Sequence, residues 1–127
     1  MKLVPSLSKR NSKSGGHMKL IYVCSPYRGD VKHNTNNARR YCRFVCSQGA
    51  VPIAVHLHHT QFLDDDIPEE RQLGLLLGLH VLRRCNELWV FGDRVSEGME
   101  AEIKTAHQIG IPIYYYSDQC EKRSNSK

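Results

Sequence analysis

The chain has 127 residues, a length typical of one domain, and a net charge of +5. Its composition, 40% hydrophobic and 24% charged, is that of a soluble globular protein. A helix needs about 20 apolar residues to span a bilayer, and no apolar run in the chain approaches this length. The N-terminus also lacks the apolar region of a secretory signal. The five cysteines form no Cys-x-x-Cys pair, which favours a reduced, cytoplasmic protein.

The positive charge is confined to the two ends of the chain. Residues 1–17 contribute +4 and residues 118–127 contribute +1, whereas residues 18–117 hold eleven basic and eleven acidic side chains. A neutral body lacks the basic surface that follows a nucleic-acid backbone. We therefore expect no nucleic-acid partner; the alternative, a nucleic-acid-associated protein, depends on these tails alone.

Residues 1–17 are predicted to be a disordered basic tail, because they lack periodicity and are rich in small polar residues. The segment Gly15–Met18 is typical of an expression tag, so Met18 is the expected natural start, and a native basic tail is the alternative. Residues 18–117 form the predicted domain, and residues 118–127 are predicted to be a polar C-terminal tail.

Predicted strands and helices alternate along the domain. Four apolar segments are predicted strands: 19–24, 51–55, 87–91 and 111–116. Three segments with helical periodicity or end signals are predicted helices: 31–48, 68–84 and 97–108. Pro68 is typical of a first helical residue and Ser96 of an N-cap, while Gly49 and Gly110 are typical of helix ends.

This alternation predicts an α/β fold of three layers, Rossmann-like or flavodoxin-like. We expect a parallel sheet of four to five strands with helices on both faces. Continuous apolar runs also fit strands that are covered on both faces. Ligands of such sheets bind beyond the carboxyl ends of the strands. The loops after Cys24, Val55 and Phe91 are therefore the candidate site.

The loop after the first predicted strand is suited to binding an anion. Ser25 offers a hydroxyl, Arg28 a forked donor, and Gly29 a position where backbone N–H groups can approach a ligand. The alternative is a plain turn with an exposed arginine.

The loop after the third predicted strand leads into a helix that also suits an anion. Free N–H groups gather near Gly98, and Glu102 lies one turn further, where its carboxylate can face the same space as Ser96. The alternative is an acidic helix face in contact with solvent.

The loop after the second predicted strand holds three histidines and three aspartates. Their spacing matches no known set of metal ligands, so neither a metal site nor a cofactor is predicted. His56, at the carboxyl end of its strand, is the histidine expected to face a ligand.

Seven segments of the domain together carry a family resemblance. They are Tyr22–Gly29, Asn34 with Ala38, Pro52–His56, Phe62–Asp65, Cys85–Gly92, Ser96–Ile103 and Gly110–Ile113. In this order they resemble the nucleoside 2-deoxyribosyltransferase-like superfamily, and most closely the uncharacterised bacterial and phage proteins of the DUF4406/DUF7768 type.

The resemblance implies a role for several residues. Glu102, four residues after Gly98, matches the nucleophile that attacks the anomeric carbon of a 2-deoxyribonucleoside, after which another base or water takes the sugar. Tyr22 is implied to lie near the sugar and the nucleophile. Similarity to the branch that acts on 5′-monophosphates implies phosphate binding by Arg28, Ser96 and the Gly98 amide.

The chain departs from the family at one catalytic position. The enzymes carry an aspartate on the helix before the third strand, where this chain has a glycine at about position 78. His56 and Asp65 are the candidate substitutes. Loss of a general acid slows such a reaction by about 10²–10⁴-fold. The expected function is thus an N-glycosidase or 2-deoxyribosyltransferase; the alternative is a non-catalytic nucleotide-binding module, a sensor or sponge of phage or bacterial origin.

The helix predicted at 68–84 also bears on assembly. Its segment 73–82 has few polar positions, and one sheet cannot bury every face of such a helix. The superfamily enzymes are dimers or larger. We therefore expect a homodimer or larger homo-oligomer that binds a small nucleotide or nucleoside, with no membrane partner.

Overall fold

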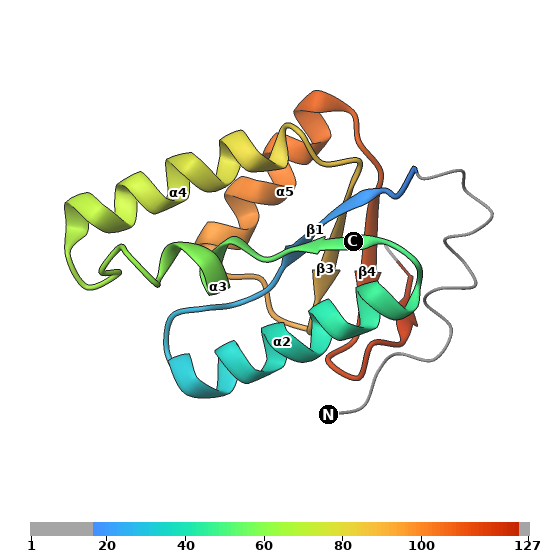
Figure 1. The fold of residues 1–127 in the computed structure, drawn as a ribbon, viewed down its shortest axis with the longest axis horizontal. Helices are drawn as coiled ribbons and strands as arrows, with labels where there is room; N and C mark the ends of the chain where they lie inside the picture. The colour runs from blue at the N-terminus through green and yellow to red at the C-terminus, as the bar shows by residue number, and fades with distance from the viewer. Residues whose placement is uncertain (1–16, 125–127) are drawn as a thin grey trace.

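The computed structural model describes residues 17–124, and strands and helices alternate along it as predicted (Figure 1). In chain order the elements are β1 (Leu20–Cys24), α2 (Val31–Ser47), β2 (Val51–Ile53), α3 (Val55–His59), α4 (Pro68–Leu82), β3 (Glu87–Phe91), α5 (Glu97–Ile109), β4 (Ile113–Tyr116) and β5 (Lys122–Arg123). The tail predicted at 1–17 lies outside the described residues except for its last position. Residues 125–127 of the predicted C-terminal tail lie outside them as well.

The strands form a single sheet in the order β2-β1-β3-β4-β5. The first four strands are parallel, and β5 runs antiparallel to β4. Tyr22 of β1 lies opposite Ile53 of β2 and Leu88 of β3. The predicted fold class is confirmed. Because the chain leaves β1 first toward β2 and later returns to β3 on its other side, the topological switch point lies between β1 and β3.

Helices cover both faces of the sheet, with α2 on one side and α4 and α5 on the other (Figure 1). Successive residues of a strand point to opposite faces, so each apolar strand supplies two cores. The core beneath α2 contains Ile21, Val23, Tyr41, Val45, Ala50, Trp89, Phe91 and Tyr116. The core beneath α4 and α5 contains Tyr22, Cys24, Val55, Leu82, Cys85, Leu88, Val90, Met99 and Ala106. This alternation directs the Tyr22 side chain toward α4 and α5.

The helix ends agree with the signals in the sequence. Ser96 caps α5, where its side-chain oxygen accepts a hydrogen bond from the Met99 N–H at 3.2 Å. Gly110 ends the same helix with a φ of 80°, a left-handed conformation that glycine adopts without strain. Pro68 occupies the first turn of α4, together with Glu69 and Glu70.

The second predicted strand is shorter than expected. β2 ends at Ile53, and Val55 begins the short helix α3 instead of ending a strand. The prediction of a strand over 51–55 and a loop after it was wrong here. The Val55 side chain is buried in the core beneath α4, so this apolar residue packs from a helix rather than from a strand.

A fifth strand lies where the sequence predicted only a polar tail. Ser117 organises the turn, because its hydroxyl oxygen accepts hydrogen bonds from the N–H groups of Gln119 and Glu121. Lys122 and Arg123 then pair with the end of β4. The Arg123 guanidinium also donates to the Gly92 carbonyl at 2.6 Å, so the segment is held by polar contacts rather than by an apolar face.

Candidate active site

Two side chains from distant parts of the sequence meet beneath the carboxyl ends of the strands. The Tyr22 hydroxyl of β1 donates a hydrogen bond to Oε2 of Glu102 on α5, at 2.6 Å. Tyr22 is 0% exposed and Glu102 6% exposed, so the hydrogen bond lies in a poorly solvated environment. The structure therefore brings together Glu102, which the resemblance matched to the nucleophile, and Tyr22, which the resemblance implied to lie near it.

This environment changes the protonation of Glu102. Burial raises the pKa of the carboxyl group to about 7, and hydrogen bonds from the Tyr22 hydroxyl and the Cys24 thiol oppose the rise. Burial, followed by the neighbouring Glu102 charge, raises the pKa of Tyr22 well above its usual value. Tyr22 therefore stays protonated and donates, while Glu102 changes its charge near neutral pH.

Cys24 is a contributor that the sequence did not single out. It is fully buried on the same face of β1 as Tyr22, and its sulfur lies 4.0 Å from the Met99 carbonyl oxygen. The general preference of cysteine for buried positions made a packing role the ordinary expectation. Its position two residues after Tyr22 on the same strand face is the signal that could have identified it.

The start of α5 contributes Ser96 and Gly98. Ser96 is exposed, and its oxygen accepts the Met99 N–H, so the hydroxyl hydrogen is still available to donate. Gly98 is half-buried and lies one turn before Glu102 on the same side of the helix. A Cβ at this position would lie 3.7 Å from Leu75 of α4, an ordinary contact.

Arg28 and Asp65 form an ion pair that the sequence did not predict. Nη1 of Arg28 donates to Oδ2 of Asp65 at 2.9 Å and to its main-chain carbonyl at 3.1 Å. The loop that carries Arg28 turns at Gly29, whose φ is 98°. Ser25, which starts this loop, is buried.

His56 lies in the helix α3 and not, as predicted, at the carboxyl end of a strand, and it is beside this ion pair. Its ring stacks on Tyr27, with the ring centres 5.0 Å apart and the planes at 17°. Burial lowers the pKa of His56, and the charge of Asp65 opposes this shift. His56 and Asp65 both line a small cavity of about 30 Å³ against α4. Tyr27 is thus a second contributor that the sequence did not single out.

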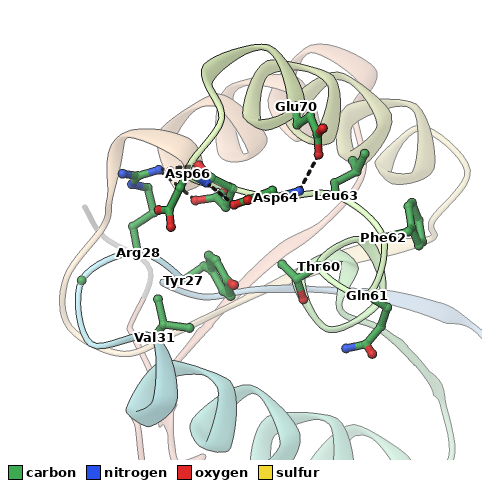
Figure 2. A pocket seen from close by; sticks show the side chains of 12 residues that line it. Tyr27, Arg28, Val31, Thr60, Gln61, Phe62, Leu63, Asp64, Asp66 and Glu70 are labelled. Atoms are coloured by element: carbon green, nitrogen blue, oxygen red, sulfur yellow. Dashed lines mark hydrogen bonds and ion pairs between the residues drawn. The ribbon is translucent and has the colours of Figure 1, made fainter.

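Two larger cavities open on either side of Arg28 and Gly29. The first, of about 760 Å³, lies between the loop after β1 and the segment that joins α3 to α4 (Figure 2). Its volume is within the range of ligand pockets. The second, of about 280 Å³, lies against the start of α2 and includes Gly92 and Arg94. Tyr22 and Glu102 line neither cavity; they lie beneath the surface.

Gly78 faces the buried pair. A Cβ at this position would lie 3.1 Å from the Tyr22 hydroxyl oxygen and 3.4 Å from Cγ2 of Val55. The helix position that the resemblance matches to the aspartate of the enzymes is therefore next to the Tyr22 hydroxyl, and it carries no side chain.

In the described part of the chain, no three His, Cys, Asp or Glu side chains converge to hold a metal ion. The helices within residues 17–124 are too short or too polar to span a bilayer.

Comparisons with known proteins bear on both the family and the fold. The model of a family described as "Domain of unknown function (DUF7768)" matches residues 19–116. Eleven chains of solved structures match. One is a 2-deoxyribosyltransferase from the psychrotolerant bacterium Bacillus psychrosaccharolyticus, with a TM-score of 0.64 and 15% identity over 83% of this chain and 77% of that chain. No curated protein matches. At this identity the structural likeness supports the fold alone.

Proposed function

Because the chain belongs to the DUF7768 family and has the fold of a 2-deoxyribosyltransferase, we propose that it is an N-glycosidase or 2-deoxyribosyltransferase acting on nucleosides or nucleotides. The observation that carries this proposal is the buried hydrogen bond between Tyr22 and Glu102. A carboxyl group in this setting, at the carboxyl ends of parallel strands, has the properties of a glycosidase nucleophile.

The proposed reaction has two steps. An oxygen of the ionised Glu102 carboxylate bonds to the anomeric carbon while the bond from that carbon to the base breaks, and the bonding electron pair leaves with the base. The base nitrogen then takes up a proton from solvent water. In the next step an oxygen of water or a nitrogen of a second base bonds to the anomeric carbon while the bond from that carbon to the Glu102 oxygen breaks. The Glu102 carboxylate is regenerated, and the proton of the incoming water or base passes to solvent. The Tyr22 hydroxyl holds the attacking carboxyl group in place, and a pKa of about 7 makes its oxygen more basic than an ordinary carboxylate.

A phosphate on the ligand is proposed to bind near Arg28. The guanidinium, the backbone at Gly29 and the buried Ser25 hydroxyl come from the loop after β1. The Ser96 hydroxyl and the Gly98 amide come from the start of α5, where the helix dipole favours a negative charge. His56 and Asp65 are assigned to the wall of the same site, next to the stacked Tyr27 ring.

One observation favours a second candidate function. Gly78 offers no proton to the departing base, although it faces the Tyr22 hydroxyl. A missing general acid costs about 10²–10⁴-fold in rate. A module of phage or bacterial origin that binds nucleotides without cleaving them, as a sensor or sponge, would keep the ligand-binding groups and tolerate this loss.

Base release decides between the two functions. The full chain is incubated with 2′-deoxynucleoside 5′-monophosphates and with the matching nucleosides, and free base is measured by chromatography. We expect release by the wild-type protein and none by Glu102→Gln. Glu100→Gln, on an exposed position of the same helix, is the matched control and should keep wild-type release. Nucleotide binding by calorimetry without any release would contradict the enzyme and support the binding module.

Assembly is proposed to involve a second copy of this chain. Leu73 and Leu76 of α4 are exposed, and Phe62 lies exposed in the preceding segment. Exposed apolar side chains on a helix with few charges favour a homo-oligomeric contact.

A further inference from the structure

The Arg28–Asp65 ion pair joins two loops that are 37 positions apart in the sequence. We propose that Asp65 is a positioning residue, which holds Arg28 through one guanidinium nitrogen and leaves the opposite edge for the phosphate of a nucleotide. The proposal rests on the function proposed above, because it assigns Arg28 to the phosphate. It also gives Asp65 a different role from the one first expected, since the carboxylate acts through Arg28 without touching the phosphate.

Both contacts with Asp65 use the same nitrogen of Arg28. Nη1 donates to the carboxylate at 2.9 Å and to the main-chain carbonyl at 3.1 Å. A guanidinium has five N–H groups, two of them on Nη1. The other three are on Nε and Nη2, whose shared edge is a fork that can bind two phosphate oxygens at once. The observed geometry therefore orients Arg28 without occupying this fork.

The loops on both sides of the ion pair are themselves held by hydrogen bonds, and Figure 2 shows the one between Asp64 and Glu70. The Asp64 N–H donates to Glu70 of the first turn of α4 at 2.6 Å, and the Asp66 N–H donates to the Asp64 carboxylate at 2.9 Å. Across the ion pair, Nδ2 of Asn34 donates to the Arg28 carbonyl at 3.0 Å. Asp65 is thus a fixed point from which the long side chain of Arg28 can be oriented.

Two features favour positioning over competition between Asp65 and the phosphate. One of the two acceptors is a neutral carbonyl, which orients Arg28 without adding negative charge. The Arg28 side chain is also 54% exposed, so solvent screens the carboxylate charge. Without Asp65, the phosphate itself would have to order a flexible side chain, and this lowers affinity.

The test compares three variants of the full chain. Asp65→Ala removes the side-chain acceptor, whereas Asp65→Asn keeps an acceptor oxygen and removes the charge. Glu69→Gln also removes one negative charge, at an exposed position in the first turn of α4 that lines none of the cavities described above, and is the matched control. Calorimetry gives the affinities for inorganic phosphate, 2′-deoxyguanosine 5′-monophosphate and 2′-deoxyguanosine. The NMR signal of the Arg28 Nε–H reports whether phosphate reaches the open edge.

Asp65→Ala is expected to weaken binding of both phosphate ligands by roughly three- to tenfold, the effect of ordering one long side chain, and to leave nucleoside binding unchanged. Asp65→Asn and Glu69→Gln should bind like the wild-type protein. Tighter phosphate binding by Asp65→Ala, an equal loss for the nucleoside, or a wild-type Arg28 signal that does not respond to phosphate would each overturn the proposal. If base release fails while these affinities behave as expected, only the proposed enzymatic function is overturned.

Discussion

At the scale of single residues, burial raises the pKa of both Tyr22 and Glu102, but the two groups differ in their protonation near neutral pH. The phenol stays neutral over the physiological range, because its pKa moves further from neutrality. The carboxyl group has a pKa of about 7, so that it is divided between its neutral and charged forms near pH 7. We therefore expect base release to increase with pH around neutrality, as Glu102 ionises to its nucleophilic form.

The same pKa makes the stability of the protein depend on pH. The folded state binds the Glu102 proton more tightly than the unfolded state, so the free energy of unfolding falls as pH rises from 4.5 to about 7. Over this range the loss amounts to about 3 kcal/mol. Glu102→Gln cannot ionise and should lack this part of the pH dependence. Urea unfolding at a series of pH values measures it.

The control for this prediction is Glu100→Gln, because Glu100 is exposed on the same helix. It should follow the wild-type pH dependence of stability. If the wild-type protein and Glu102→Gln lose stability equally between pH 4.5 and about 7, burial does not raise the Glu102 pKa as described.

Individual site residues differ in how far the sequence can predict them. Glu102 and Tyr22 lie in motifs that resemble a known family, and the structure brings them together. Cys24 and Tyr27 belong to the same segment, but a buried thiol and an aromatic loop residue usually have packing roles. Their contacts with Glu102 and His56 depend on how separate elements pack. No local pattern records that packing.

At the scale of elements, α4 carries two glycines, and it approaches the buried pair of Tyr22 and Glu102 at one of them, Gly78. Gly74 and Gly78 are four residues apart and lie on the same side of the helix. Gly78 is buried and faces Tyr22, whereas Gly74 is half-buried and faces Leu63. Glycine within a helix is less favourable than alanine by about 1 kcal/mol. At position 78 the close approach of Tyr22 accounts for the absence of a side chain.

Alanine should therefore stabilise the protein at position 74 and impair base release at position 78. Gly74→Ala adds a Cβ 3.7 Å from Leu63, an ordinary contact, and should stabilise the protein by about 0.5–1 kcal/mol without changing base release. Gly78→Ala adds a Cβ 3.1 Å from the Tyr22 hydroxyl oxygen, so Tyr22 must shift. Base release should then fall roughly tenfold, because small misplacements of catalytic groups are costly. Thermal unfolding and base release are measured for both variants. Equal effects of the two would contradict this view of α4.

Elements with periodicity and end signals are predictable, and very short ones are not. The helix α5 has a serine cap and a terminal glycine, and it begins and ends close to the predicted limits. The helix α3 has five residues and no side-chain cap, and its apolar start continues the run of β2. The strand β5 has two charged residues and no apolar alternation. Both depend on tertiary contacts that a local pattern does not contain.

At the scale of the whole molecule, the alternation of strands and helices is enough to predict the parallel sheet and the edge where its loops converge. The ion pair of Arg28 and Asp65 is not predictable in the same way. It depends on the path of residues 60–67, which form neither a strand nor a helix. The fold thus indicates where to look for the site, while the irregular segments decide which side chains meet there.

Apolar side chains are exposed on the outer side of α4 and in the segment before it. Leu73 is 43%, Leu76 52% and Phe62 57% exposed, although α4 already packs against α5 on its other side. We expect a homodimer or larger homo-oligomer, because covering these apolar side chains with a second copy removes them from water.

Sedimentation velocity of the wild-type chain and of Leu76→Lys tests this expectation. A charged group in an apolar contact is strongly unfavourable, so Leu76→Lys should shift the protein to monomers while its circular dichroism stays that of the wild type. Ile109→Lys changes another exposed apolar residue, at the end of α5, and should leave the mass unchanged. A monomeric wild-type protein would contradict the assembly. The exposed side chains of α4 would then have no partner in a second copy of this chain.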